Sequence, residues 1–511
     1  MRQVTGRAGH IVVIGAGLAG LSAAIHLAGR GRAVTVLERD TVPGGRAGRA
    51  DIGGCRLDLG PTVLTMPDLV DEVFAAVGEN TDDHLRLVPV DPSYRARFAD
   101  GRELDVHTGA DRMSSAIADF AGPREAAGYR KLRRWLTRLY DTEFERFIAT
   151  NIDSPASLLT PDTARLIMAG GLRRWDRAVA DHLHDPDVRR LFTFQSLYAG
   201  VAPARALAAY AVIAYMDTIR GVFFPLGGMR ALPDALATVA TRAGVDIRYG
   251  TTVASAQRSG SRVRAVTTAD GRRIDCDALV STAELHHTYE LLTHRSRRPQ
   301  RPIPAPSAVV VHVSCDPAPR LAHHSLLFGR AWNETFDDLL TDGRPMRDPS
   351  LLLTRPTATD STLAPPGRDL ISVLAPAPNL ARAPIDWDRY GPDYTEEILA
   401  TVNRRLPTPL TGVEVLHVRT PADWARQGML AGSPFALAHT LSQTGPLRPA
   451  NMIRGLDNVV LAGSSTVPGV GIPPVLVSGR LAADRITGTV TARTALAAEP
   501  LLTHTYRSPT P

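Results

Sequence analysis

The first strongly patterned stretch of the chain is an apolar run that leads through several glycines into a second apolar run. Residues 11–14 are four consecutive β-branched residues, which predict a strand buried on both faces. Residues 21–28 have the composition of a buried helix, and residues 33–37 form a second strand-like run. A strand, a helix and a strand in this order predict a βαβ unit with a parallel sheet, and therefore an α/β fold.

The turn between the first strand and the helix carries a Gly-x-Gly-x-x-Gly pattern. Gly15 permits the tight turn, Gly17 lets a pyrophosphate approach the backbone, and Gly20 lets the helix pack closely on the strand. The free amide groups of the helix N-terminus then face a diphosphate. Glu38 ends the second strand roughly 20 residues later, where a carboxylate binds an adenosine ribose hydroxyl and repels a 2′-phosphate. The stretch predicts a dinucleotide site and argues against NADP.

Two further glycine-rich segments point to the same kind of site. Gly44 and Gly45 suggest a second close approach of backbone to ligand, and Arg46 has the charge to neutralise a diphosphate. Near the far end of the chain, residues 458–465 predict a strand, and residues 468–486 predict a glycine turn that enters a helix. This repeats the arrangement at the N-terminus, so both ends of the chain are expected to contact one ligand.

The middle of the chain follows other patterns. Helical periodicity dominates 67–74, 128–140 and 162–215, and an Asp-Gly turn predicts a hairpin at 94–104. Buried or half-buried strands are predicted at 57–64, 221–225, 244–253, 262–268, 273–283, 308–313, 325–328, 350–354, 370–374 and 413–417. The aromatic-rich residues 192–200 either pack in the core or line an apolar pocket, and the irregular loop 354–367 is expected to border a site.

These elements predict a Rossmann-like domain assembled from separate segments, with an inserted α+β substrate domain. The expected cofactor-domain segments are residues 1–80, 223–290 and 441–490. The expected insertions are a mainly helical part at 81–222 and a β-rich part at 291–440, followed by a disordered tail at 491–511. A chain of 511 residues has room for such a two-domain arrangement.

Composition narrows the class of protein. The formal charge is +6, but no cluster of aromatic and basic residues predicts nucleic-acid binding. The three cysteines, Cys55, Cys276 and Cys315, are far apart, so they fit neither a metal site nor a disulfide framework, and they suggest a reducing compartment. No apolar run precedes the first strand, and the most apolar segment, 206–216, is too short to span a bilayer. Monotopic association with a membrane stays open.

Several blocks together give the sequence a family resemblance. They are Val13–Leu21, Leu37–Arg39, Pro43–Ala47, Leu59–Leu64, Phe192–Gly200, Phe224–Met229, Leu321–Ser325, Leu363–Gly367, Gly432–Phe435, His439–Gln443, Leu447–Pro449 and Asn458–Leu476. On these blocks the chain resembles the bacterial-type phytoene desaturases, which are FAD-dependent carotenoid oxidoreductases. It departs from their usual pattern at Val467, where they often carry His, and at Ala438, where they often carry an acid.

The resemblance implies that FAD is the cofactor and that a long apolar polyene is the substrate. A hydride passes from the polyene to the flavin, and the vicinal proton leaves. The resemblance also implies peripheral contact with lipid at the inner face of the cell membrane, a cytoplasmic location, and an electron acceptor such as quinone or oxygen. No catalytic acid or base is assigned. The residues implied to bind the cofactor are Gly15, Ala16, Gly17, Leu18, Ala19, Gly20, Glu38, Arg39, Gly45, Arg46, Gly60, Pro61, Thr62, Val253, Gly463, Gly471 and Ile472.

Within this resemblance, desaturation of phytoene toward lycopene is the expected activity. Other activities of the same family stay open: a diapophytoene or hydroxycarotenoid desaturase, a ketolase or a saturase. A non-catalytic isoprenoid-binding protein of the GDP-dissociation-inhibitor type is disfavoured by the second, C-terminal cofactor block. A flavin amine oxidase is disfavoured because no aromatic pair flanks the final glycine turn.

Overall fold

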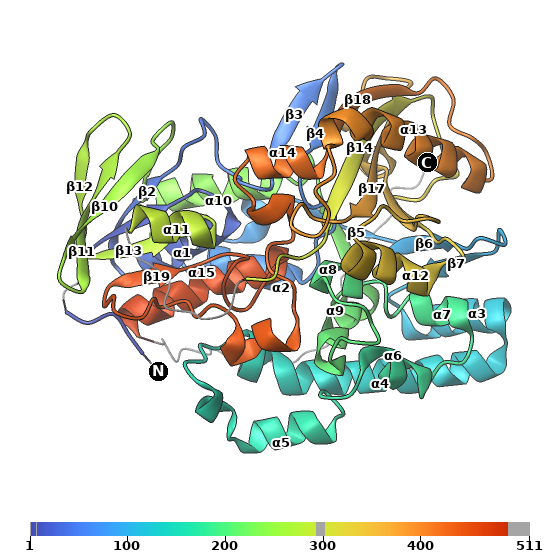
Figure 1. Ribbon diagram of the computed structural model, residues 1–511, viewed down its shortest axis with the longest axis horizontal. Helices are drawn as coiled ribbons and strands as arrows, with labels where there is room; N and C mark the ends of the chain where they lie inside the picture. Colours follow the sequence, from blue (N-terminus) through green and yellow to red (C-terminus); the bar gives the residue numbers. More distant parts are fainter. Residues whose placement is uncertain (1, 7, 293–301, 489–511) are drawn as a thin grey trace.

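The computed structural model describes residues 2–6, 8–292 and 302–488. The predicted disordered tail at 491–511 lies outside these residues. Figure 1 shows a parallel sheet with its helices on the left, a larger mixed sheet on the right, and a layer of helices below. Segments far apart in the sequence meet in each of these parts.

The first sheet has five parallel strands. Their order across the sheet is β19 (Val459–Leu461), β13 (Ala278–Ser281), β1 (His10–Ile14), β2 (Ala33–Leu37) and β9 (Asp246–Arg248). Nearly every residue of the three central strands is buried, because helices cover the sheet, and this explains why these strands are mostly apolar along their whole length. N-terminal, middle and C-terminal strands share one sheet, as the predicted Rossmann-like fold requires.

Two helices from opposite ends of the chain pack against each other on this sheet. They are α1 (Leu18–Gly29) and α15 (Ile472–Thr487). A Cβ atom on Gly479 would lie 2.6 Å from the carbonyl oxygen of Ala19, so the close crossing depends on that glycine. The Ser22 hydroxyl donates a hydrogen bond of 2.8 Å to the carbonyl oxygen of Leu476. The two glycine-turn helices predicted from the sequence are therefore direct neighbours.

The second sheet has seven strands and carries the other half of the molecule. Its order is β18 (Glu414–Arg419), β14 (Ser307–Cys315), β17 (Asp369–Ala377), β16 (Leu351–Thr354), β15 (His324–Leu327), β6 (Tyr94–Arg97) and β7 (Glu103–Val106). All five strands predicted between residues 302 and 426 are present in it, and so is the predicted hairpin at 94–104.

The stretch 302–426 also contains helices that the β-rich interpretation missed. The largest is α13 (Trp387–Arg405), which covers the second sheet with Trp387, Tyr394, Ile398 and Val402. Its interior proline, Pro392, argues against a helix in a sequence pattern, whereas the apolar face packed on the sheet stabilises one. The two shorter helices are α12 (Trp332–Asp337) and α14 (Pro421–Arg426).

The remaining elements confirm the helical middle segment and the small hairpins. The helical layer comprises α3 (Ala110–Ala121), α4 (Pro123–Glu143), α5 (Pro161–Met168), α6 (Trp175–Ala180), α7 (Pro186–Arg190), α8 (Ser196–Ala199), η4 (Ala208–Ala211) and α9 (Val212–Tyr215). Helix α2 (Pro67–Ala75) packs instead against α1 and α15. Two further helices, α10 (Ala231–Arg242) and α11 (Leu285–Leu291), belong to the cofactor side. The short strands are β3 (Arg49–Ile52), β4 (Cys55–Asp58), β5 (Leu87–Val90), β8 (Val222–Pro225), β10 (Val253–Ser259), β11 (Arg262–Thr268) and β12 (Arg273–Asp275). Across the described ranges, no helix combines the length and apolarity needed to cross a bilayer.

Candidate active site

The glycine turn after β1 is closed so tightly that it excludes side chains. Gly15 has a φ of +100°, and its N–H donates to the carbonyl oxygen of Leu37 over 2.8 Å. A Cβ atom on Gly15 would lie 2.3 Å from the hydroxyl oxygen of Thr282, and one on Gly20 would lie 2.0 Å from the carbonyl oxygen of Gly15. Both predicted glycine roles, the tight turn and the close helix contact, are visible in these distances.

A second glycine loop faces the first. The N–H of Gly44 donates to the carbonyl oxygen of Ala16 over 2.9 Å, and Gly17 pairs with Gly44 as a parallel bridge. A Cβ atom on Gly45 would lie 3.3 Å from the Cα atom of Gly17. Helix α1 begins here, and its N-cap residue is Gly17, which has no side chain to bond the first amides. Bare backbone and a free helix N-terminus fit a diphosphate.

Glu38 lies at the edge of this cradle, directly after β2. Its side chain is 5% exposed, and its two oxygens accept hydrogen bonds from the N–H groups of Ala16 (2.5 Å) and Asp40 (3.0 Å). The carboxylate is thus held at the strand end, where an adenosine ribose is expected. Val253, at the start of β10, is buried in the same apolar cluster as Leu37. Arg39 instead turns outward and donates to the carbonyl oxygen of Gln427.

Arg46 joins three distant segments of the chain. Its guanidinium donates to the hydroxyl of Ser464 and forms an ion pair with Glu284. The hydroxyl of Ser465 donates to the other carboxylate oxygen of Glu284 over 2.8 Å. Sequence reasoning missed Glu284. The signal available was its position three residues after β13, since residues that follow parallel strands meet at the ligand edge of a sheet.

The C-terminal glycines complete the cradle. Gly463 has a φ of +111°, and its N–H donates to the hydroxyl of Ser478 over 3.0 Å. A Cβ atom on Gly463 would lie 3.8 Å from that of Ala19, so the two ends of the chain meet at this point. Gly471, with a φ of +117°, is the N-cap of α15, and Ile472 is its first, buried residue.

Gly60, Pro61 and Thr62 lie between the cradle and the second sheet. A Cβ atom on Gly60 would lie 1.8 Å from the carbonyl oxygen of Arg46. The hydroxyl of Thr354, at the end of β16, donates to that of Thr62 over 3.1 Å. The Nδ1 atom of His324 is 3.0 Å from the same Thr354 hydroxyl. This polar group therefore connects the predicted flavin-side turn to the second sheet.

A small apolar pocket of about 40 Å³ follows β16 away from this junction. Its lining residues are Phe194, Leu197, Tyr198, Pro306, Ser307, Leu326, Phe328, Trp332, Ser350, Leu351, Leu352, Leu374, Pro376 and Phe435. The aromatic stretch 192–200 therefore does both things that were left open: Phe192 is fully buried in the core, whereas Phe194 and Tyr198 line the cavity.

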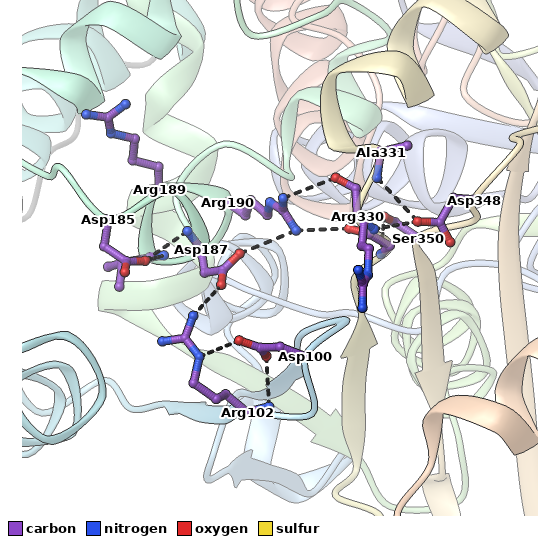
Figure 2. Close-up of polar contacts among 12 residues, drawn as sticks. Asp100, Arg102, Asp185, Asp187, Arg189, Arg190, Arg330, Ala331, Asp348 and Ser350 are labelled. Carbon is purple, nitrogen blue, oxygen red and sulfur yellow. Dashed lines mark hydrogen bonds and ion pairs between the residues drawn. The ribbon is translucent and has the colours of Figure 1, made fainter.

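Polar contacts lie next to Ser350, which lines the pocket, and Figure 2 shows them. Arg190 donates to the carbonyl oxygen of Gly329 over 2.9 Å, and the hydroxyl of Ser350 accepts from the N–H of Gly329 over 3.1 Å. Arg102 pairs with Asp187 over 2.7 Å. These contacts join α7 to the β6–β7 turn and to the loop after β15. No local sequence pattern signals them, because the partners are far apart along the chain.

Several buried ionisable groups lie near the cavity. Burial raises the pKa of Asp217 to about 7, although the hydroxyl of Tyr94 donates to its carboxylate over 3.2 Å. The Tyr94 ring is 5.4 Å from that of Phe194, which lines the cavity. Burial holds the pKa of His324 well below its usual value, so its imidazole is neutral. Val467 and Ala438, the two departures from the family pattern, are both buried.

Comparison with known proteins agrees with this geometry. A model of the flavin-containing amine oxidoreductase family matches residues 18–487. A phytoene dehydrogenase of Streptomyces griseus is 56% identical over 96% of this chain and 98% of its own. A zeta-carotene-forming phytoene desaturase of Myxococcus xanthus is 33% identical over 93% of each chain. A lycopene-forming phytoene desaturase of a Paracoccus strain is 33% identical over 93% of this chain and 96% of its own.

Solved structures with little sequence identity share the fold. An oxidoreductase from Methanosarcina mazei aligns with a TM-score of 0.64 at 16% identity, covering 92% of this chain and 99% of its own. A putrescine oxidase aligns with a TM-score of 0.59 at 15% identity, covering 93% and 98%.

A parallel sheet with a glycine cradle at its strand ends, closed by a second helix N-terminus, defines a flavin-dependent oxidoreductase. The chain belongs to the phytoene desaturase family within the flavin-containing amine oxidoreductases. Its cofactor is FAD, and the side-chain-free cradle of Gly15, Gly17 and Gly45 fits the diphosphate of that group.

Proposed function

We propose that the protein is an FAD-dependent carotenoid desaturase that converts phytoene through successive desaturations toward lycopene. The observation that carries this proposal is the apolar cavity along β16. Leu351 and Leu352 of that strand line the cavity, and its last residue, Thr354, bonds to Thr62 beside the cofactor cradle. A long apolar chain lying along β16 would therefore reach the cofactor with one part, and the lining side chains would move apart to admit the rest, because the pocket is small.

We further propose the roles of the cradle residues. Gly15, Gly17 and Gly20 approach the diphosphate, Glu38 binds the adenosine ribose, and Arg46 lies near the diphosphate. Ala16, Leu18, Ala19, Arg39, Gly45, Gly60, Pro61, Thr62, Val253, Gly463, Gly471 and Ile472 line the rest of the cofactor. The outward guanidinium of Arg39 leaves only its backbone for this role. The free N-terminus of α1 and the buried carboxylate of Glu38 support these assignments.

The reaction requires that the protein hold the substrate in position and exclude water. FAD, when bound, accepts a hydride from the polyene, and a proton leaves the neighbouring carbon. The apolar wall of Phe194, Leu326 and Phe328 holds the chain and excludes water. His324 stays neutral beside Thr354, so it adds no charge to the apolar chain's environment.

The proposed partners follow from the substrate. A carotenoid dissolves in lipid, so we propose peripheral contact with the inner face of the cell membrane and a cytoplasmic body. The reduced cofactor needs an acceptor such as quinone or oxygen. The segments 1–80, 223–290 and 441–490 are proposed as the cofactor domain, and 81–222 with 291–440 as the substrate domain. The β6–β7 hairpin of the first insertion lies in the sheet of the second, which supports one joint substrate domain.

Product analysis tests the proposal. The protein is expressed in cells that supply phytoene, and the pigments are separated by chromatography. Lycopene as the main product is expected. Zeta-carotene or neurosporene as the end product would contradict the number of steps, and unchanged phytoene would contradict the activity. The variant Gly60→Ala, which we expect to lose flavin because a Cβ atom there would overlap the Arg46 carbonyl oxygen, serves as the negative control.

A further inference from the structure

A carboxylate without a cationic partner is enclosed where the helical layer meets the second sheet. Asp217 belongs to η5 (Met216–Arg220), a segment of π-helix that continues α9. The residue is 4% exposed, and no arginine or lysine in the described part of the chain pairs with it. Arg220, on the same element, is bound to Asp68 instead over 2.7 Å. A buried carboxylate that no cation neutralises is costly, and such groups concentrate at functional sites.

Two tyrosines connect this carboxylate to the apolar pocket. The hydroxyl of Tyr94, at the start of β6, donates to Asp217 over 3.2 Å. Tyr198, on α8, lines the pocket, and it lies beside Tyr94, since each of the two phenols influences the pKa of the other. The Tyr198 hydroxyl is enclosed but makes no hydrogen bond of ordinary geometry within the described residues. The three side chains therefore form a row from the pocket lining to Asp217.

Tyr94 also contacts the flavin side of the site. Its ring lies 5.6 Å from the ring of His324, centre to centre. The Nδ1 atom of His324 is 3.0 Å from the Thr354 hydroxyl, which bonds to Thr62 of the predicted flavin-side turn. A continuous row of contacts therefore runs from Asp217 to the turn expected to border FAD. Neither cofactor binding nor apolar packing requires a carboxylate at the end of that row.

Desaturation releases a proton that an apolar pocket cannot hold. Departure of the hydride leaves a cation on the polyene. The electron pair of a neighbouring C–H bond then forms the new C=C double bond, and the proton of that bond is set free. Its acceptor has to lie within hydrogen-bond reach of the chain. Among the ionisable side chains of the pocket lining, only Tyr198 qualifies, and its hydroxyl leads toward Asp217.

We propose that Tyr198, Tyr94 and Asp217 form a relay that accepts this proton. The proton moves from the carbon to the Tyr198 oxygen, the Tyr198 O–H proton moves to the Tyr94 oxygen, and the Tyr94 O–H proton moves to the Asp217 carboxylate. Both tyrosines end as neutral phenols, the polyene loses its positive charge, and the carboxylate becomes a neutral acid. The inference rests on the proposed desaturase function and deepens it by assigning the proton acceptor.

Charge balance favours Asp217 over the nearest other base, His324. The Nε2 atom of His324 is also buried without a partner in the described ranges. A proton on this imidazole would create a buried cation, and burial holds its pKa well below the usual value. A proton on Asp217 removes a buried charge, and burial raises the pKa of this carboxyl to about 7. Burial also raises the pKa of both tyrosines, so they pass protons on without ionising.

Anaerobic bleaching of the bound flavin by phytoene dispersed in detergent tests the relay. The rate for the parent should rise roughly tenfold per pH unit up to about pH 7 and then level off, because only the ionised carboxyl accepts a proton. Asp217→Asn should lower the rate at about pH 8 on the order of a hundredfold and remove the rise, and Asp217→Glu should restore part of both. Tyr198→Phe should lower the rate similarly, although it keeps the ring in the pocket lining.

Infrared spectroscopy adds a measurement that does not depend on turnover. Without phytoene, the parent should lose the absorption of a protonated, buried carboxyl as the pH rises through about 7, and the Asp217→Asn spectrum should lack this change. Glu143→Gln is the matched control. Burial holds the pKa of Glu143 well above its usual value, so this carboxyl is already neutral, and it does not line the pocket. Its rate and pH profile should equal those of the parent at equal flavin content.

The outcomes separate the relay from the desaturase function. If phytoene bleaches the parent and Asp217→Asn with the same rate and pH profile, the relay is wrong and the desaturase function stands. An equal loss of rate in Glu143→Gln, or a loss in Asp217→Asn that leaves the pH profile unchanged, would make Asp217 a structural residue. If phytoene bleaches the parent at no pH, the desaturase function fails and the relay fails with it.

Discussion

Changing Asp217 to asparagine should make the stability of the protein less sensitive to pH. The Asp217 carboxyl is fully enclosed and lies beside Tyr94 and Gln195. Burial raises its pKa from 3.8 to about 7, against the opposing effect of hydrogen bonds from those two side chains. The folded protein therefore holds a proton on this group in a pH range where the unfolded chain has released it.

The sign and size of the effect on the free energy of unfolding follow from that difference in proton binding. The free energy of unfolding falls as the pH rises from about 4 to about 7, and it stays at the lower level above that range. A pKa that moves from 3.8 to about 7 corresponds to roughly 4 kcal/mol in this group alone. Asparagine has no charge to desolvate. The Oε1 atom of Gln195 has no partner within the described part of the chain, so it offers an acceptor for the new amide.

The assay is urea unfolding of parent and variant across this pH range. Asp58 and Glu143 also have a raised pKa through burial, so the informative quantity is the difference between the two proteins. That difference should favour the variant increasingly from about pH 4 to about pH 8. Asp338→Asn is the matched control of opposite sign. Burial opposes the charge of the Asp338 carboxylate, but hydrogen bonds from Arg347 outweigh this effect and lower its pKa. Loss of that carboxylate should therefore destabilise the protein most at neutral pH.

A parent-variant difference for Asp217 that stays constant with pH would refute the reasoning. It would mean that the carboxyl titrates in the folded protein as it does in the unfolded chain. A difference that grows in the opposite direction would mean that its hydrogen bonds, and not its burial, control the group.

Three further changes test the cofactor cradle. Gly60→Ala should abolish flavin retention, because its Cβ atom would lie 1.8 Å from a carbonyl oxygen. Gly109→Ala, whose Cβ atom would make only an ordinary contact 3.9 Å from the Cβ atom of Arg112, should keep the yellow colour measured as absorbance per protein. Gly479→Ala should cost about 1–3 kcal/mol in urea unfolding, because its Cβ atom would press on α1; an unchanged midpoint would contradict the close packing. Arg46→Ala should weaken FAD binding at least tenfold in a fluorescence titration and leave Glu284 without its ion pair; equal affinity would exclude Arg46 from the site.

The parallel sheet was predictable because the residues that specify its strands and turns lie close together in the sequence. The strands β1 and β2 are short, mostly β-branched runs, and Gly20 faces the carbonyl oxygen of Gly15, only five residues away. The hairpins at 94–104 and 262–275 were predictable for the same reason, because in each an Asp-Gly turn lies directly between the two strands that pair.

The features that the sequence did not reveal depend on contacts between residues far apart along the chain. Helix α13 contains Pro392, and the packing of Trp387 and Ile398 on the second sheet overrides that local signal. Glu284 and Thr354 enter the site through partners at Arg46 and Thr62, more than two hundred residues away. The exposure of single residues on α5 is likewise not signalled by the sequence, because Leu166 and Ile167 look alike until the fold buries the first and exposes the second.

The contacts of Arg46 suggest how folding and cofactor binding are linked. Its ion pair with Glu284 and its bond to Ser464 join three segments that the long substrate insertions separate along the chain. Ordering three such segments costs loop-closure entropy, and a cofactor that touches all three stabilises only the arrangement in which they meet. The cradle should therefore be the part of the protein that gains most stability from FAD. Its amide hydrogens should exchange far more slowly in the loaded protein, while those of β14 and β17 in the second sheet should change little.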